Sequence, residues 1–471
     1  MDQKDLYQFD EEFRDTIATV DESGKRIWVY PKKPQGYYHN LRIGFTILLL
    51  GILFAGPFIT IGGKPLLLLN IFERKFVIFG QAFWPQDFFL LALLLITFFV
   101  IVILFTVVFG RLWCGWACPQ TLFMEMVFRK IEYWIEGDAN QQRKLDQQPW
   151  SFEKIRKKGL KHLIYISIAF LISHTVMSYL LGYEQVLDIV SQPPSTNMAG
   201  FTGMLVFTGI FYWVFAYLRE QACVAICPYG RLQGVLLDNK SIAVMYDWLR
   251  GEPRGKLKKN EPVEEKGDCI DCKLCVHACP TGIDIRNGTQ LECVNCTACI
   301  DACDDVMEKI NKPKGLIRYA SHESISTGTK NLFNTRVKAY SVVLLLLMSI
   351  LISALVSRSD IETTVLKVPG QLYQRTDRGT ITNLYNIQFV NKTFDDMEVE
   401  VKVLKNPEAL ISKVGGGAQN LKANSLSEGV YFIELPYKAI TSARMKLELG
   451  IYVNGELEET VNTKFLGPIN N

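Results

Sequence analysis

Residues 269–303 read CIDCKLCVHACPTGIDIRNGTQLECVNCTACIDAC and contain eight of the twelve cysteines of the chain. The stretch holds two copies of the spacing C-x2-C-x2-C-x3-C, and Pro280 directly follows the first copy. In bacterial ferredoxins with two [4Fe–4S] clusters, three cysteines of such a run bind one cluster and the fourth binds the other. The spacing therefore predicts a ferredoxin-type domain with two [4Fe–4S] clusters.

The crossover of the fourth cysteine sorts the eight thiols into two sets of predicted cluster ligands. The first cysteine group is Cys269, Cys272, Cys275 and Cys303, and the second cysteine group is Cys279, Cys293, Cys296 and Cys299. One departure from the ferredoxin pattern is Asp304, which stands after Cys303 where a proline is usual but removes no ligand. The alternative is a pair of zinc sites, although four-cysteine zinc sites more often show two separated C-x2-C pairs.

Five stretches contain no Asp, Glu, Lys or Arg, and each is about as long as the 20 apolar residues that cross a bilayer. They are residues 43–63, 88–110, 162–183, 189–218 and 339–357. Lys and Arg number six in 1–40, nine in 111–159 and sixteen in 221–336, against three in 64–86 and none in 183–199. Because basic loops remain in the cytoplasm, we expect a multi-pass protein of the bacterial inner membrane. Its N-terminus and clusters would be cytoplasmic, and its C-terminal region periplasmic.

The other four cysteines form two pairs that directly follow the second and fourth stretches. Cys114 and Cys118 lie in WCGWACP, Cys223 and Cys227 lie in CVAICP, and we call these four the membrane-edge cysteines. The repeat suggests a duplicated unit whose symmetry axis could bring all four thiols together. Proline after the second cysteine of each pair favours a helix start, where the helix dipole lowers a thiol pKa.

Soft thiolates prefer Cu(I), zinc or iron–sulfur clusters. The membrane-edge cysteines could therefore bind copper, ligate a third cluster, or pass electrons through a dithiol–disulfide couple. Four unrelated cysteines that merely pack at helix ends are the alternative, which the repeated spacing disfavours.

In the C-terminal region, apolar and polar residues alternate along several short segments. Strands are predicted at Ile381–Val390, Met397–Leu404, Gly429–Leu435 and Met445–Val453, and a hairpin turn at Asn454-Gly455. Strands of this length and spacing suggest an immunoglobulin-like sandwich of about 100 residues.

The fold class is therefore mixed: about five membrane helices, an inserted two-cluster ferredoxin-type domain and an all-β C-terminal sandwich. The predicted parts are a cytoplasmic segment 1–40, a four-helix membrane domain 41–240, the ferredoxin-like domain 241–336, a fifth helix 337–357 and the exported domain 358–471. Among 471 residues the formal net charge is only +3, which gives no reason to expect nucleic acid as a partner.

The order of these motifs resembles the CcoG (also FixG or RdxA) family of cytochrome c oxidase accessory proteins. The resemblance rests on IWVYP at 27–31, the two CxxxCP motifs, the eight-cysteine stretch and the β tail. It implies a role in maturing cbb3-type cytochrome c oxidase, in which Cu(II) is reduced to Cu(I). The membrane-edge cysteines would carry that copper chemistry, as catalytic and metal-binding residues.

The resemblance also implies partners, namely the oxidase or its copper-delivery factors. An electron donor, which the sequence does not identify, and a second copy of the chain are further candidate partners. Nitrate- and nitrous-oxide-reductase-associated membrane ferredoxins share the CxxxCP pairs. A quinol-linked relay without copper and a non-catalytic assembly scaffold are therefore alternative functions.

Overall fold

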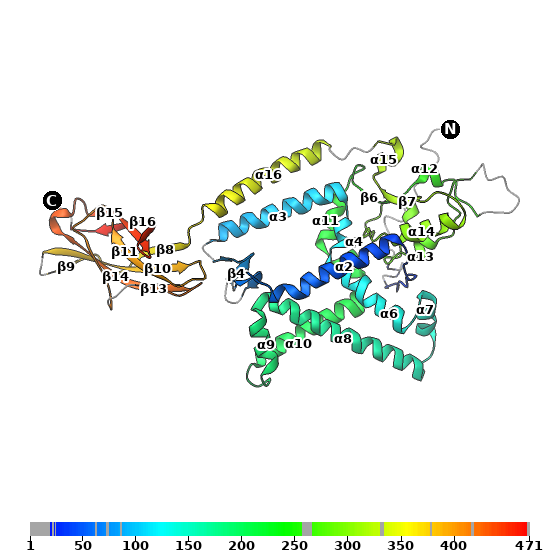
Figure 1. Ribbon diagram of the computed structural model, residues 1–471, viewed down its shortest axis with the longest axis horizontal. Coiled ribbons are helices and arrows are strands. Elements are labelled where there is room, and N and C mark those ends of the chain that lie inside the picture. The colour runs from blue at the N-terminus through cyan, green and yellow to red at the C-terminus, as the bar shows by residue number, and fades with distance from the viewer. Residues whose placement is uncertain are drawn as a thin grey trace. The chain divides into compact units, whose positions relative to one another are not determined.

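The computed structural model describes residues 19–20, 23, 25–61, 64–71, 75–84, 87–256, 266–329, 334–376, 379–415 and 419–468. Most of the predicted segment 1–40 therefore lies outside the described residues. The chain, coloured by residue number in Figure 1, divides into two compact units that each combine separate parts of the sequence. Unit 1 comprises Met1–Pro57 and Leu95–Met348, and unit 2 comprises Phe58–Leu94 and Ser349–Asn471.

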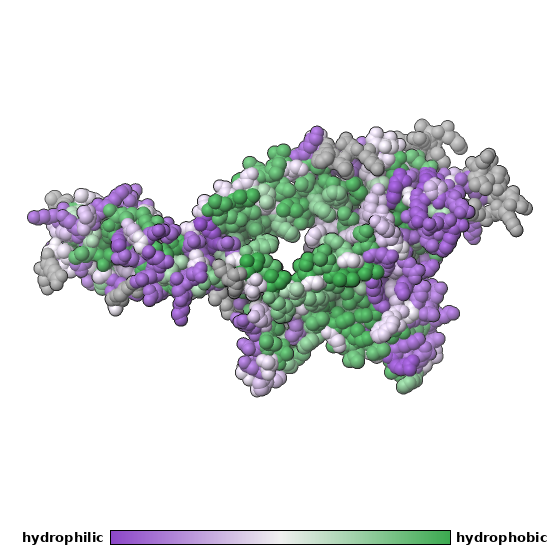
Figure 2. Space-filling view, viewed as in Figure 1, coloured by the Kyte–Doolittle hydropathy of each residue, from purple (hydrophilic) through white to green (hydrophobic). Residues whose placement is uncertain are grey.

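Five helices in the described chain are long and apolar enough to cross a membrane. They are α2 (Tyr37–Ala55, continued to Phe58 by a short 3-10 turn), α3 (Phe88–Phe109), α8 (Phe152–Leu181), α10 (Met198–Trp213, continued to Leu218 by a π-helix) and α16 (Thr335–Val356). Their surfaces are largely hydrophobic (Figure 2), and Leu345, Leu346 and Ile352 of α16 are each more than half exposed. Such apolar surface is expected where lipid surrounds the helix.

Two of these helices have boundaries that differ from the uncharged stretches. Helix α8 begins at Phe152, ahead of the stretch at 162, because the side chain of Ser151 accepts a hydrogen bond from the Lys154 amide. The stretch 189–218 does not form one helix. A separate helix α9 (Tyr183–Ser191) ends before the two prolines 193–194, and α10 starts after the Asn197 cap.

The remaining elements of unit 1 surround the cysteines. Between the second and third long helices lie α4 (Leu112–Trp116), α5 (Pro119–Leu122), a π-helix (Phe123–Phe128), α6 (Arg129–Ile135) and α7 (Ala139–Gln147). After the fourth come a π-helix (Ala222–Ile226), α11 (Pro228–Leu236), β6 (Ala243–Tyr246), α12 (Trp248–Gly251), α13 (Leu274–His277), α14 (Ala298–Lys309), β7 (Ile317–Ala320) and α15 (His322–Thr327).

Strands β6 and β7 pair antiparallel and enclose the eight-cysteine stretch in sequence. The core around them joins buried aliphatic and aromatic side chains to the thiols, among them Val244, Tyr246, Ile285, Ile300, Met307, Leu316 and Ile317. Cys303 lies inside α14, and this explains the departure at Asp304. A proline inside a helix would remove a backbone hydrogen bond, whereas Asp304 accepts a hydrogen bond from the Gly315 amide at 2.8 Å.

In unit 2, two antiparallel sheets form the C-terminal all-β domain. One has the order β12-β14-β10-β8 with β9 beside β10, and the other has the order β13-β11-β15-β16. The strands are β8 (Ile361–Lys367), β9 (Gln374–Arg375), β10 (Thr380–Asn391), β11 (Met397–Val403), β12 (Leu410–Lys413), β13 (Gln419–Leu421), β14 (Leu426–Pro436), β15 (Arg444–Val453) and β16 (Glu456–Leu466).

The four predicted strands are confirmed as β10, β11, β14 and β15. Asn454 and Gly455 join β15 to β16 with positive φ angles of 48° and 92°, as a tight hairpin turn requires. Unit 2 also contains short strands of the segment between α2 and α3: β1 (Thr60–Ile61), β2 (Lys64–Pro65), β3 (Leu67–Asn70), β4 (Lys75–Ile78) and β5 (Gln81–Phe83).

Candidate functional site

The structure brings Cys303 to the other three members of the first cysteine group. Burial raises the pKa of the Cys303 thiol, and nearby negative charge on Cys275, Cys269 and Cys272 raises it further. Burial likewise raises the pKa of Cys275 to about 12, with Cys272 and Cys269 among its neighbours. The fourth thiol of this group thus comes from the end of the second run, whereas the other three come from the first run.

The second cysteine group shows the reciprocal crossover. Burial raises the pKa of Cys293 to about 12, and Cys279 and Cys296 add to that rise. Burial also raises the pKa of Cys299 well above its usual value, with Cys296, Cys293 and Cys279 next in effect. Cys279, the last cysteine of the first run, therefore lies with the second.

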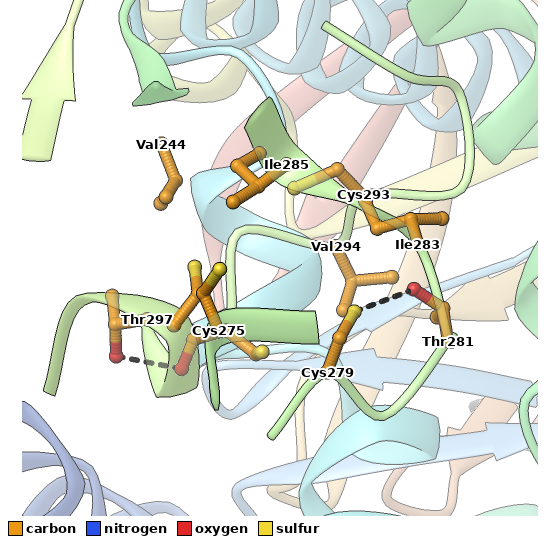
Figure 3. Close-up of a pocket in the computed structure, with 11 residues that line it drawn as sticks. Val244, Cys275, Cys279, Thr281, Ile283, Ile285, Cys293, Val294 and Thr297 are labelled. Carbon is orange, nitrogen blue, oxygen red and sulfur yellow. Dashed lines mark hydrogen bonds between the residues drawn. The ribbon is translucent and has the colours of Figure 1, made fainter. Parts of the chain in front are cut away.

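The two groups meet around one small cavity (Figure 3). Thiols of both groups line it together with apolar side chains: Cys275, Cys279, Cys293, Cys296, Cys299, Val244, Ile283, Ile285 and Val294. The Cys279 sulfur lies 3.3 Å from the Thr281 hydroxyl. Two clusters bound by these groups would be neighbours, with aliphatic side chains around the cavity they share.

The same backbone conformation occurs on both sides of the second cysteine of each run. Asp271 and Lys273 flank Cys272 with φ angles of 52° and 56°, and Asn295 and Thr297 flank Cys296 with 53° and 66°. Residues other than glycine rarely adopt such left-handed conformations. Alternation of right- and left-handed residues points successive amides inward and forms an anion-binding concavity that is frequent at Fe–S sites. The residues present therefore fit an anionic cubane cluster.

No described residues form a group of three or more His, Cys, Asp or Glu side chains that could hold a single metal ion. The thiolates of a cubane bind four separate irons, so they need not converge on one point. This spread disfavours the alternative of two four-cysteine zinc sites, in which the ligands surround one ion.

The membrane-edge cysteines occupy matching positions in the two CxxxCP motifs. Cys118 is the residue before α5 and Cys227 the residue before α11, with proline as the first helical residue in both cases. Their backbone angles are nearly the same, φ −65° and ψ 122° for Cys118 and φ −66° and ψ 114° for Cys227. The predicted helix starts are thus present.

The four membrane-edge thiols lie together. Burial raises the pKa of Cys223 to about 12, and Cys118, Cys114 and Cys227 raise it further. Burial raises the pKa of Cys114 to about 11, with Cys118 and Cys227 among its neighbours. For Cys114 and Cys223, burial thus acts against the lowering that a helix dipole gives, because it disfavours the charged thiolate.

Polar side chains contact the buried thiols of this site. The Cys114 thiol donates a hydrogen bond to the Gln233 side-chain oxygen at 3.4 Å, and the Cys223 sulfur lies 3.9 Å from the Thr121 hydroxyl. Gln233 is fully buried on α11, and its side-chain nitrogen makes no hydrogen bond to any described residue. That nitrogen remains available to a ligand or water.

The membrane-edge site packs directly against the second cysteine group. Cys114 and Cys223 both contact a buried cluster that contains Cys296, Val294, Ala278 and Ala298. A side chain on Gly115, between Cys114 and Cys118, would meet the Asn295 and Val294 carbonyl oxygens at 2.5 and 2.6 Å. The absence of a side chain at 115 therefore permits this close approach.

Hydrogen bonds hold the two sites together. Arg42 of α2 is buried and donates to the carbonyl oxygens of Gly115 at 3.1 Å and of Cys296 at 2.8 Å. Trp116 donates through its indole nitrogen to the Tyr319 hydroxyl at 2.9 Å. Sequence analysis did not identify Arg42, Gly115 or Gln233, and the one available signal was an arginine at the edge of a membrane helix.

Comparison with known proteins agrees with this description. Residues 218–322 match the family described as a 4Fe-4S dicluster domain, and residues 91–137 match a 4Fe-4S binding domain. Residues 351–468 match the family described as the IG-like fold at the C-terminal of FixG. The matches confirm the mixed fold class, in which membrane helices accompany iron–sulfur domains and an immunoglobulin-like domain.

Three relatives match long parts of the chain. Protein RdxB of Cereibacter sphaeroides is 35% identical over 87% of this chain and 89% of its own length. Protein RdxA of the same organism is 34% identical over 80% of this chain and 82% of its own length. Nitrogen fixation protein FixG of Rhizobium meliloti is 35% identical over 63% of this chain and 58% of its own length. The chain therefore belongs to the FixG/RdxA family, and it is a membrane iron–sulfur electron-transfer protein.

Proposed function

We propose that this protein reduces Cu(II) to Cu(I) at the membrane-edge cysteines, with electrons that arrive through the first and second cysteine groups. Each cysteine group would hold one [4Fe–4S] cluster, which exchanges one electron at a time when bound. Copper is the substrate: each Cu(II) ion gains one electron and leaves as Cu(I). The resemblance to the cytochrome c oxidase accessory family supports the proposal that the Cu(I) product is used in maturation of a cbb3-type oxidase.

The observation that carries this proposal is the packing of Cys114 and Cys223 against the buried cluster of side chains that contains Cys296. One buried cluster of side chains connects a four-thiol site to the second cysteine group. The first cysteine group adjoins the second around the cavity in Figure 3. An electron can therefore pass from the first group to the second and then to the membrane-edge thiols without crossing water.

The sulfur chemistry of these side chains supports reduction rather than storage of Cu(II). Raised pKa values keep Cys114 and Cys223 neutral at pH 7 until a metal displaces their protons. Thiolate sulfur binds Cu(I) in preference to Cu(II), so a thiolate site stabilises the reduced ion. Since no three described thiols converge on one point, an ion is held by two thiols or draws in more of them by side-chain rotation.

Contacts within unit 2 support the proposed topology. Asp87, directly before α3, forms ion pairs with Arg358 at 2.6 Å and Lys392 at 2.7 Å, and Trp84 donates a hydrogen bond to Asn424. The segment between α2 and α3 must then lie on the same side of the membrane as the β domain. We propose that this side is outside the cytoplasm, because five spans together with basic loops favour that orientation.

The test is metal and activity analysis of anaerobically purified full-length protein. Changing Cys114 and Cys118 to Ser, or Cys223 and Cys227 to Ser, should abolish copper binding and Cu(II) reduction while about eight irons per chain remain. Iron content is the internal control for folding. Copper binding and reduction at the wild-type rate in the variant that lacks both pairs would contradict the proposal.

A third [4Fe–4S] cluster on the membrane-edge cysteines is the second candidate. It is favoured by the match of residues 91–137, which include Cys114 and Cys118, to a 4Fe-4S binding domain. Under this alternative the wild-type protein holds about twelve irons, and each paired Ser variant loses about four of them. Iron counting in the same samples therefore separates the two functions.

A further inference from the structure

A groove lies beside the first turn of α2, at one end of a helix long enough to cross the membrane. Its volume is about 570 Å³, and it lies between the start of α2, the π-helix Phe123–Phe128 and α6. Trp134 lines the groove and is 77% exposed. Tyr37 follows the lining residue Gly36 in sequence and is 72% exposed. Exposed aromatic side chains at a helix end are typical of the membrane–water interface, so a lipid-soluble ligand could enter here.

The groove reaches toward the second cysteine group through a much smaller cavity. Four residues line both: Pro34, His39, Glu125 and Tyr133. The small cavity is also lined by Cys296 and has a volume of about 10 Å³, close to the space for one water molecule. A ligand in the groove therefore lies within a few side chains of a proposed cluster ligand.

The groove carries an excess of positive charge. Lys33 and Lys130 line it, and the sole acidic residue of its described lining, Glu125, is paired with Arg129 at 3.5 Å. Burial lowers the pKa of Lys130, and the charges of Arg42 and Lys33 lower it further. Such a lining favours a ligand with oxygen atoms that accept hydrogen bonds or carry negative charge.

His39 presents a neutral ring nitrogen to the groove, because burial and the charges of Lys130, Arg42 and Lys33 lower its pKa to about 4. Its Nδ1 atom is buried and makes no hydrogen bond to any residue in the described parts of the chain. The side chain lines both the groove and the small cavity. A buried ring nitrogen without a partner is unfavourable unless a ligand or water satisfies it.

We infer that this groove binds the headgroup of a lipid-soluble quinol, which is the electron donor of the protein. The inference rests on the proposed clusters. Oxidation of one quinol to the quinone releases two electrons and two protons. One electron goes to each of the two clusters, and both protons go to water at the open side of the groove, while neutral His39 Nδ1 accepts a hydrogen bond from a quinol hydroxyl. Two Cu(II) ions can then be reduced for each quinol.

The first experiment maps binding directly. Full-length protein in lipid nanodiscs is illuminated with a short-chain azidoquinone, and labelled peptides are identified by mass spectrometry. We expect labels on residues 33–43 or 130–134. Labels elsewhere, or none at these positions, would overturn the inference. So would complete displacement of the label by phosphatidylglycerol, because the groove would then be an anionic phospholipid site.

The second experiment measures cluster reduction by a quinol in Lys130→Gln and His39→Gln variants. Lys144→Gln is the matched control, since Lys144 lies on α7, outside the groove. We expect labelling and the rate of quinol-driven bleaching to fall roughly tenfold or more in the groove variants only. Bleaching by dithionite should stay normal.

The outcomes separate this inference from the proposed function. Protein with eight irons that reduces copper after dithionite treatment, but is neither labelled nor reduced by quinol, would refute only the donor site. Protein that lacks iron on the two cysteine groups would refute the proposed clusters, and the inference with them. Unchanged labelling and rates in both groove variants would contradict the assigned residues.

Discussion

Gly115 illustrates how single residues shape the candidate site. It sits between two membrane-edge cysteines, and the Val294–Asn295 backbone approaches it so closely that a Cβ atom would lie 2.5 Å from a carbonyl oxygen. Backbone atoms cannot rotate away as a flexible side chain can. Any side chain at 115 must therefore push the membrane-edge site and the second cysteine group apart.

Gly115→Ala should lower the free energy of unfolding of the purified protein by about 1–3 kcal/mol, the usual effect of overpacking, and so lower its melting temperature. It should also slow Cu(II) reduction, because the distance between the two sites increases. Gly44→Ala on α2 is the control, since a Cβ atom there would meet nothing within 4 Å. Equal melting temperatures and reduction rates for the two variants would contradict the close-contact explanation.

At the scale of elements, a residue of the cluster domain caps a membrane helix. The Asp301 carboxylate, on α14, accepts hydrogen bonds from the first amides of α2, those of Tyr38 at 3.0 Å and His39 at 2.7 Å. Gly36 precedes α2, and a Cβ atom on it would meet the Asp301 side chain at 2.4 Å. The start of α2 is thereby held against the helix that carries Cys299 and Cys303.

Asp301→Ala should cost about 1–2 kcal/mol, because two amides at the positive end of α2 lose their acceptor. Hydrogen exchange at the Tyr38 and His39 amides should accelerate. Asp305→Ala is the control, since Asp305 is exposed on the same helix and pairs only with Lys309 among the described residues. Unchanged exchange in Asp301→Ala would show that the cap does not hold the helix start.

Further along the chain, α6 and α8 are joined by buried ion pairs. Glu132 pairs with Arg219 at 2.6 Å and with Lys161 at 3.7 Å, and all three side chains are almost fully buried. Burial alone would raise the pKa of Glu132, but Arg219, Lys161 and Arg129 hold it below its usual 4.5. This carboxylate stays ionised because buried cations surround it. Without it, Lys161 would keep its pair with Glu136 at 2.9 Å, and Arg219 only its longer pair with Glu220 at 3.9 Å.

Glu132→Gln should therefore destabilise the protein by about 3–5 kcal/mol. The exposed pair Glu153–Lys157 gives the control, and Glu153→Gln should leave the free energy of unfolding nearly unchanged, because water screens an exposed ion pair. A carboxyl group with a lowered pKa in the folded state stabilises above its ordinary pKa, and this contribution is lost as pH falls through the lowered value. Melting temperature should thus fall more steeply below pH 4.5 in wild type than in Glu132→Gln.

At the scale of the whole molecule, each compact unit joins distant parts of the sequence. Unit 2 combines Phe58–Leu94 with Ser349–Asn471, and the ion pairs of Asp87 lie between these parts. The two parts are connected by helices that are long enough to cross a membrane. If each of the five helices found in the described residues crosses the membrane once, we expect residues before α2 and residues after α16 to lie on opposite sides.

A reporter that is active only after export should therefore be active when fused after Asn471, and inactive when fused within residues 266–329. A fusion between Leu67 and Asn70 should behave as the C-terminal fusion does, because that segment belongs to the same unit. Cytoplasmic behaviour of the C-terminal fusion would mean that a span is miscounted, with α10 as the first suspect.

Local patterns in the sequence predicted much of the fold and many residues of the candidate site. Cysteine spacing indicated two ferredoxin-type runs, uncharged length indicated five membrane helices, and alternation with Asn-Gly located the β15–β16 hairpin. Each pattern acts within a few turns or strands, so it can be recognised without knowledge of the fold. The predicted ends of α8 and α10 were less accurate, because capping residues and prolines decide where these helices begin, and the length of an uncharged stretch does not show them.

Contacts between distant segments were decided only by the tertiary structure. The approach of Gly115 to Asn295, the bridge that Arg42 makes between two cysteine sites, and the groove from His39 toward Cys296 all join segments far apart in sequence. The left-handed residues beside Cys272 and Cys296 likewise follow no glycine pattern. Such features depend on how the helices pack and on what each backbone then meets, and spacing along one chain does not contain that information.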